Sequence, residues 1–74
     1  MTTPFSADLE LATRHVTEGA ERVLNQTRLV ERLKAGGHDT AEAEKLLAEF
    51  RHALALMQDH RDRLQAAHGA PDGH

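Results

Sequence analysis

The stretch that decides the fold is residues 35–40, which read Ala35-Gly36-Gly37-His38-Asp39-Thr40 and stand near the midpoint of the 74-residue chain. Glycine is the usual residue just past the end of a helix, where the backbone φ becomes positive, and Gly36 or Gly37 suits that position. Asp39 is suited to cap a second helix, with Glu42 placed as in a capping box. So short a connection makes two long helices antiparallel, which predicts a helical hairpin.

Both segments that flank this stretch carry heptad patterns. The first has the series Leu9, Val16, Val23, Val30 and Ala12, Gly19, Gln26, Leu33; the second has Leu47, Leu54, Arg61, His68 and Ala43, Phe50, Met57, Leu64. We therefore expect an all-α fold, an antiparallel two-helix hairpin over 7–68 with helix one at about 7–35, a turn at 36–39 and helix two at about 40–68. An N-terminal arm over 1–6 and a disordered tail over 69–74 complete the prediction.

The position of the turn predicts which residues of the seam between the helices face each other. The expected pairs are Val30 with Leu47, Gln26 with Phe50, Val23 with Leu54, Gly19 with Met57, and His15 or Val16 with His60 or Arg61. The sequence leaves open that the two helices are shifted by one helical turn from this alignment.

A second apolar stripe flanks this seam. It holds Leu46, Ala53, Leu56, His60 and Ala67 on helix two, with Leu11 and Leu29 on helix one. An apolar arc wider than a two-helix seam indicates a further partner surface.

The core of a single hairpin is thin, because Phe5 and Phe50 are the only aromatic residues. Ordering each residue costs roughly 1.5 kcal/mol, whereas apolar burial returns only about 25 cal/mol per Å². We therefore predict a homo-oligomer, a dimer that forms a four-helix bundle. The expected interface residues are Val16, Gly19, Val23, Gln26, Leu46, Phe50, Leu54, Leu56 and Met57.

Two seam residues stand out because neither is a strong core former. Gly19 lies inside a helix, where glycine costs about 1 kcal/mol relative to alanine, so we interpret it as a point of close helix approach. Gln26 occupies a position where an apolar residue would stabilise more, and a polar residue there can fix register or oligomer order.

Six histidines raise the question of a metal site, but no two have the three- or four-residue spacing of helical chelation. Only His15 and His60, brought together across the hairpin, could share an ion, with Glu18 nearby or with a second subunit. We favour hydrogen-bonded imidazoles and predict no cofactor. The alternative is a metal- or pH-responsive dimer, in which protonation of both imidazoles beside Arg61 gathers like charge at the open end.

Several function classes find little support in the sequence. There is no cysteine, the sole serine is Ser6, and no phosphate-binding glycine loop is present, so we predict no enzymatic activity. The net charge of −3 gives no general attraction to nucleic acid or anionic lipid. With no signal peptide and no apolar run of membrane-spanning length, we expect a cytoplasmic protein.

Four arginines, Arg14, Arg22, Arg28 and Arg32, are predicted to share the outer face of helix one. They raise the alternative of an RNA-binding four-helix dimer similar in length and architecture to the Rop-type plasmid regulator. Glutamates on the same face predict ordinary ion pairs, Glu10 with Arg14 and Glu18 with Arg22. The mixed charge and the absence of stacking aromatics favour a solvated face over a nucleic-acid site.

One resemblance covers nearly the whole hairpin. It rests on His15-Val16, Glu18-Gly19, Gln26, Leu29-Val30, residues 37–43, Leu46-Leu47, Phe50, His60-Arg61 and Arg63-Leu64. With these residues the chain resembles a recurrent set of short, uncharacterised bacterial proteins. The resemblance implies a small stand-alone bacterial hairpin and assigns no role to any residue. We expect such a hairpin to act through homo-oligomerisation or protein–protein interaction, as a regulator or adaptor.

Overall fold

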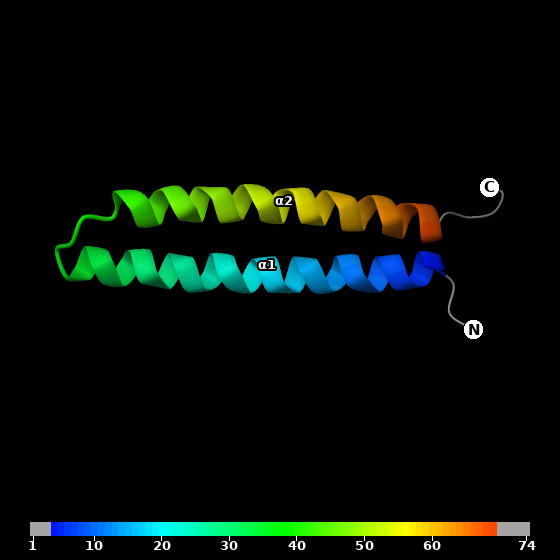
Figure 1. Cartoon of the computed structure of the whole chain (residues 1–74), viewed down its shortest axis with the longest axis horizontal. Helices are drawn as coiled ribbons and strands as arrows, with labels where there is room; N and C mark the ends of the chain where they lie inside the picture. Colours follow the sequence, from blue (N-terminus) through cyan, green and yellow to red (C-terminus); the bar gives the residue numbers. More distant parts are fainter. Residues whose placement is uncertain (1–3, 70–74) are drawn as a thin grey trace.

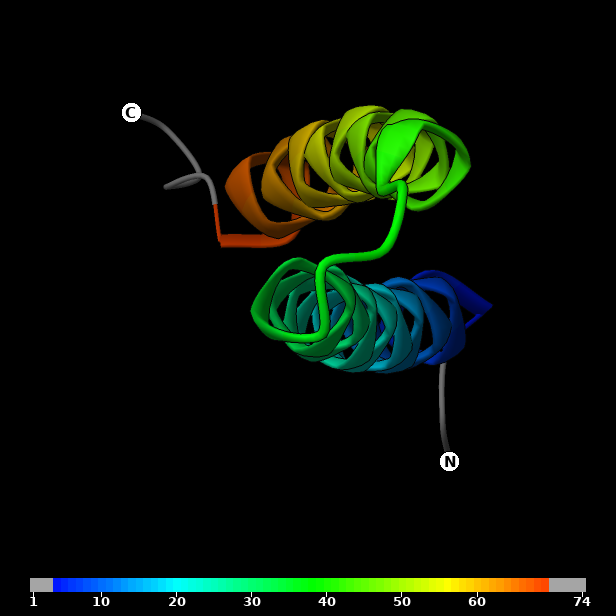
Figure 2. The same ribbon diagram turned by 90° about the vertical axis from the view of Figure 1, so that its left-hand side faces the viewer.

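The computed structural model of the chain confirms the all-α helical hairpin. It describes residues 4–69, with side chains described for 7–67. Helix α1 spans Pro4–Ala35 and helix α2 spans Ala41–Gly69, and they lie antiparallel, side by side (Figure 1). The hairpin is long and narrow, at 58 × 24 × 14 Å, and the end-on view shows the helices crossing at a shallow angle (Figure 2). Over the described residues, neither helix has a stretch apolar and long enough to cross a membrane.

The helix boundaries differ slightly from the predicted ones. Helix α1 begins at Pro4 rather than at 7, since proline is tolerated in a first helical turn, so residues 4–6 belong to the helix and not to an arm. Helix α2 begins one residue late, at Ala41, and runs to Gly69. The rest of the predicted arm and tail, residues 1–3 and 70–74, lies outside the described residues.

The end of α1 shows which of the two glycines makes the turn. Gly37 has a φ of 74°, and its N–H donates to the Lys34 carbonyl at 3.0 Å. The His38 N–H donates to the Leu33 carbonyl at 2.9 Å, which completes a Schellman motif. Gly37 is therefore the residue that needs to be glycine for its backbone conformation.

The start of α2 is capped by Asp39, as predicted, but with a different carboxylate partner. The Asp39 Oδ1 accepts a hydrogen bond from the Ala41 N–H at 2.9 Å. The Thr40 hydroxyl donates to the Glu44 carboxylate, so Glu44 rather than Glu42 supports the cap. Because α2 starts at Ala41, Glu44 lies one turn after Thr40 and can reach it.

The seam between the helices forms a narrow core. Its buried residues are Ala12, Val16, Gly19, Gln26, Val30 and Leu47. Among the described side chains none is fully buried. A compact monomer of this mass is expected to expose roughly 4,500 Å². The hairpin has an accessible surface of 5519 Å², about 1,000 Å² more. A single hairpin therefore exposes more surface to water than a compact chain of its mass.

The register of the two helices follows from the contacts of Gly19 and Gln26. A Cβ placed on Gly19 would lie 3.1 Å from the Met57 Sδ, in line with the predicted pair, but also 3.9 Å from the Leu54 Cα. The Gln26 Nε2 donates to the Ala43 carbonyl at 3.0 Å, on the turn side of Phe50. The Leu54 contact lies three residues, about one helical turn, from the predicted partner of Gly19, and the long Gln26 side chain reaches further in the same direction; this is the slip that the sequence left open. The reason is visible in Figure 1: the connection runs back along α1 before α2 begins.

Candidate interaction surface

Three surface hollows lie along one side of the hairpin. Apart from the seam residues, the α1 residues that line them belong to two heptad series: Asp8, His15, Arg22 and Leu29, and Leu11 and Glu18. Residues seven apart share one face of a helix that packs at heptad spacing. The hollows therefore form one continuous surface, which we call the groove face.

The half of the groove face near the turn is apolar with an acidic rim. Its hollow, about 530 Å³, is lined by the leucines Leu29, Leu33 and Leu46 around the buried Gln26 amide, whose Nε2 is already bonded to the Ala43 carbonyl. The charged residues around it are Asp39, Glu42, Lys45 and Glu49. Negative charge thus predominates at this end of the groove face.

The open end of the groove face brings together the two histidines predicted to meet. His15 and His60 line one hollow of about 130 Å³ with Asp8, Leu11 and Leu64. Within residues 7–67, no group of three or more metal-ligating side chains stands in coordinating geometry. The guanidinium of Arg61 bonds to the Asp62 carboxylate at 2.9 and 3.1 Å, so its charge is already paired beside His60. His15 and His60 therefore line the same hollow, as the sequence predicted.

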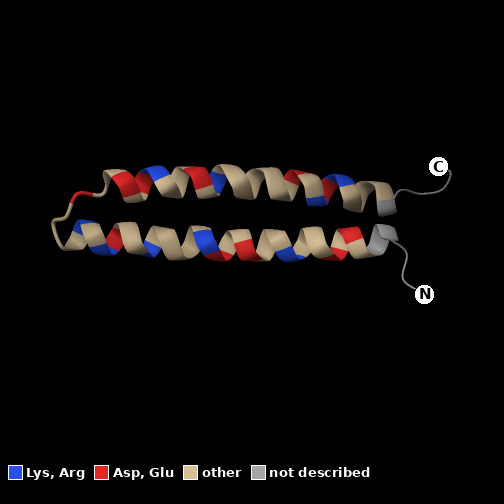
Figure 3. Cartoon of the chain, viewed as in Figure 1, with Lys and Arg blue, Asp and Glu red and all other residues tan. Residues whose placement is uncertain are grey.

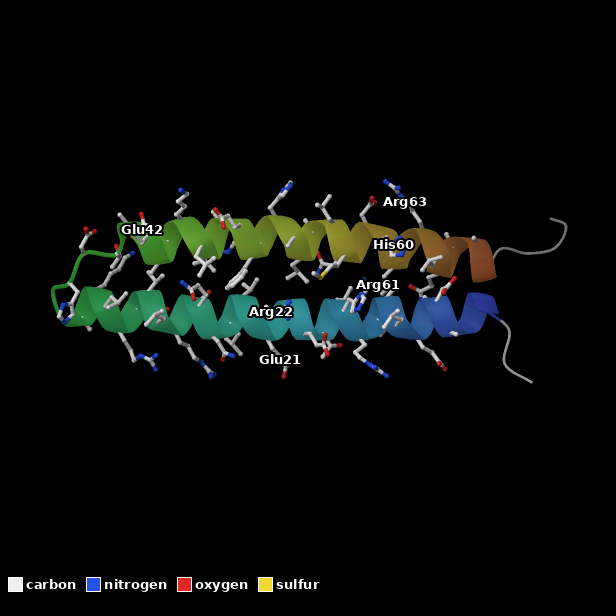
Figure 4. All side chains as sticks on the ribbon, viewed as in Figure 1. Glu21, Arg22, Glu42, His60, Arg61 and Arg63 are labelled. Carbon is white, nitrogen blue, oxygen red and sulfur yellow. The ribbon has the colours of Figure 1, made fainter. Side chains whose placement is uncertain are left out.

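The prediction that Arg22 lies on the outer face of α1 is wrong. Arg22 lines a hollow with His15, Glu18 and Met57, so it belongs to the groove face and not to an outer arginine stripe. Glu21, by contrast, points away from α2 (Figure 4). Arg22 directly precedes the seam residue Val23 and therefore lies beside the seam. Arg32 continues the heptad series of Leu11 and Glu18, so it too lies on the groove face and not on the predicted outer stripe.

Charge on the hairpin is mixed rather than gathered into a basic stripe (Figure 3). In the described part of the chain the ion pairs are Arg61 with Asp62 and Arg63 with Asp59. The predicted pairs of Glu10 with Arg14 and Glu18 with Arg22 are wrong. Exposed pairs of this kind contribute little to stability, so the fold does not depend on them.

The opposite side of the hairpin is polar. Its residues are Thr13, Ala20, Thr27 and Lys34 on α1, and Glu44, Arg51, Gln58 and Gln65 on α2. Two threonine hydroxyls on this side donate back to their own helix, from Thr13 to the Leu9 carbonyl and from Thr27 to the Val23 carbonyl. No leucine occurs in these two series, although the exposed Leu24 lies beside them; the other exposed leucines among the described side chains, Leu11, Leu46 and Leu56, belong to the groove face.

The nine residues expected at an interface divide into two groups. Val16, Gly19 and Gln26 are buried in the seam of the hairpin itself, and Val23, Phe50, Leu54 and Met57 are half-buried there. Leu46 and Leu56 remain 40% and 59% exposed, as does Leu11 at 47%. These three leucines are free to meet another molecule.

Other residues of this surface were not among the expected interface residues. The acidic residues Glu42 and Glu49 stand seven residues apart, and Leu56 and Arg63 continue the same series. This spacing was the available signal that these residues share the groove face. Leu24, 49% exposed, was also not singled out; its heptad position lies away from the groove face.

Comparison with protein-family models, curated proteins and solved structures returned no match to this chain.

Proposed function

We propose that the protein acts by self-association: two copies pack their groove faces together into a four-helix bundle, and the dimer serves as a small helical regulator or adaptor. The observation that carries this proposal is that three of the four exposed leucines among the described side chains, Leu11, Leu46 and Leu56, lie on one face of the hairpin. Burial of apolar surface is the main driving force for such association. The proposal needs no catalytic residue and no cofactor.

The available area supports an interface of ordinary size. A stable complex removes about 800 Å² from each partner, and the hairpin exposes about 1,000 Å² more than a compact chain of its mass. A long, flat face of 58 by 24 Å can supply this area when it meets a second copy. Such a dimer would cover the leucines and thicken a core that has no fully buried side chain among the described residues.

The test measures molar mass by light scattering at micromolar concentration. We expect wild-type protein at about twice the 8.2 kDa mass of the chain. The double variant Leu46→Gln/Leu56→Gln should dissociate, because it places two amides in the interface that would have to be desolvated.

The matched control is Leu24→Gln, which changes an equally exposed leucine away from the groove face and should leave the dimer intact. A wild-type mass equal to one chain across this concentration range would refute self-association. Equal loss of dimer in the control would refute the groove face as its site.

A further inference from the structure

We propose that the two copies lie with their turns at opposite ends, so that α1 packs against α1 of the second copy and α2 against α2. This inference rests on the proposed dimer and adds its geometry. It follows from the order of charged and apolar residues along the groove face, combined with the register inside one hairpin.

The groove-face residues of α1 are complementary to those of a second α1 helix that runs in the opposite direction. Its two series are Asp8, His15, Arg22, Leu29 and Leu11, Glu18, Asn25, Arg32. Two α1 helices, one from each copy, can be placed antiparallel so that their Ala20 residues stand at the same level. Between the copies, Asp8 then lies opposite Arg32, Leu11 opposite Leu29, His15 opposite Asn25, and Glu18 opposite Arg22. Every charged residue then faces the opposite charge, and the exposed Leu11 faces a leucine.

The register of the hairpin fixes the corresponding point on α2. Since Gly19 lies against the Leu54 Cα, Ala20 is level with Ala53. A two-fold symmetry axis at this level therefore also pairs α2 with α2 of the second copy, antiparallel and level at Ala53.

Reversal of α2 about Ala53 gives a second set of matched residues. Leu46 comes opposite His60, Glu42 comes within one residue of Arg63 at the other end of the helix (Figure 4), and Glu49 comes within one residue of Leu56. Ala53 meets its own copy at the axis, where its small side chain allows the helices to approach. The axis chosen from the α1 pairs thus adds one charge pair on α2, Glu42 with Arg63.

The competing arrangement places both turns at the same end and packs α1 against α2 of the second copy. It pairs Leu29 with Leu46 and Arg32 with Glu42, but it sets the Glu18 carboxylate opposite Leu56. It also crowds His15 and His60 of both copies at one level, and it leaves Leu11 against polar residues. Both arrangements set a carboxylate beside Leu56, Glu18 in this one and Glu49 in the opposed one. The competing arrangement forms only the charge pair of Arg32 with Glu42, whereas the opposed arrangement forms three such pairs, so the competing arrangement is disfavoured.

Because the chain has no cysteine, single introduced cysteines report the geometry directly. We expect an equal mixture of Leu11→Cys and Leu29→Cys chains to form a covalent dimer on mild oxidation, because these positions face each other between copies. A mixture of Leu29→Cys and Leu46→Cys chains should stay uncrosslinked. Each single variant alone is the control, and Ala53→Cys alone should crosslink with itself.

The outcomes separate this inference from the proposed function. Light scattering before oxidation establishes whether a dimer exists; a monomer refutes both proposals. A dimer that crosslinks through Leu29→Cys and Leu46→Cys, or that fails to link Leu11→Cys with Leu29→Cys, refutes the opposed turns and leaves self-association standing.

A charge exchange gives a second, independent readout. Glu18→Arg should raise the dimer dissociation constant by about tenfold, because it faces Arg22 of the second copy twice in a symmetric dimer. The double variant Glu18→Arg/Arg22→Glu should restore most of the affinity. Glu21→Arg makes the same charge change on the outer side of α1 and should have little effect (Figure 4). An equal effect of Glu18→Arg and Glu21→Arg would overturn the assigned contact.

Discussion

At the scale of single residues, the missing side chain of Gly19 governs how closely the helices pack. A Cβ there would lie 3.1 Å from the Met57 Sδ and 3.3 Å from the Leu54 Cδ1, distances tighter than ordinary contact. Both neighbours are flexible side-chain ends, so a small addition can be absorbed, whereas a large one must push the helices apart.

We expect Gly19→Leu to lower the free energy of unfolding by about 2 kcal/mol through overpacking of the seam. Gly19→Ala should be close to neutral, since a gain of about 1 kcal/mol in helix propensity offsets the tight contact. Urea denaturation of both variants measures this, with Ala20→Leu as the exposed neighbouring control. Equal stability of Gly19→Leu and Ala20→Leu would contradict close packing at Gly19.

Gln26 is the buried polar residue of the seam, 9% exposed, and it ties α1 to the Ala43 carbonyl of α2. The bond depends on the side chain being a donor at this point. Its isostere glutamate, when ionised, presents only acceptors to that carbonyl.

The variant Gln26→Glu should therefore lose about 2 kcal/mol of stability at neutral pH, because a buried carboxylate faces a carbonyl oxygen without a donor. The loss should shrink as the pH falls, since the protonated carboxyl can donate. Thermal unfolding from neutral to acidic pH tests this against Gln58→Glu, a matched change at an exposed position. If the two variants differed by the same amount at every pH, the proposed role of the donor would be excluded.

At the scale of elements, the turn sets both the ends of the helices and their alignment. Gly37 ends α1 in a left-handed conformation, and Asp39 caps the first N–H of α2. Between them the chain runs back along α1, so α2 starts inward of the α1 end (Figure 1). The turn is thus the structural origin of the register seen at Gly19.

Removal of the cap by Asp39→Ala should cost about 1 kcal/mol, because the Ala41 N–H loses its acceptor at the start of the helix. Asp39→Asn keeps an oxygen acceptor and should recover most of that stability. Chemical denaturation followed by circular dichroism compares the two. Similar destabilisation by both variants would point to the charge of Asp39, acting on the helix dipole, rather than to the hydrogen bond.

At the scale of the whole molecule, the hairpin is an elongated, two-sided body. One face carries exposed leucines between charged rims, and the other carries threonine, glutamine and charged residues. With so thin a core, folding and association are expected to be coupled.

We therefore expect the melting temperature to rise with protein concentration, by about 3 to 6 °C for each tenfold increase, because dissociation accompanies unfolding. Calorimetry over a hundredfold concentration range measures this. The dissociated variant Leu46→Gln/Leu56→Gln should melt at a lower temperature that does not change with concentration. A constant melting temperature for the wild type would contradict coupled folding and association.

Much of this organisation could be predicted from the order of the residues. The glycines and Asp39 identified the turn, and the heptad series identified the seam and the flanking stripe that holds Leu46 and Leu56. The errors concerned residues whose environment depends on both helices together. Arg22 was predicted on the outer face, and Gln26 opposite Phe50 rather than bonded to Ala43.

The sequence by itself determined the helices, their antiparallel order and the face left apolar, because propensity, capping and heptad spacing are local properties of one chain segment. Only the tertiary structure decided the register across the seam. The path of residues 36–40 sets how far α2 slides along α1, and a shift of one turn satisfies the same heptad pattern. Contacts of Gly19 with Leu54 and of Gln26 with Ala43 select one alignment, in which Ala20 and Ala53 stand at the same level along the hairpin.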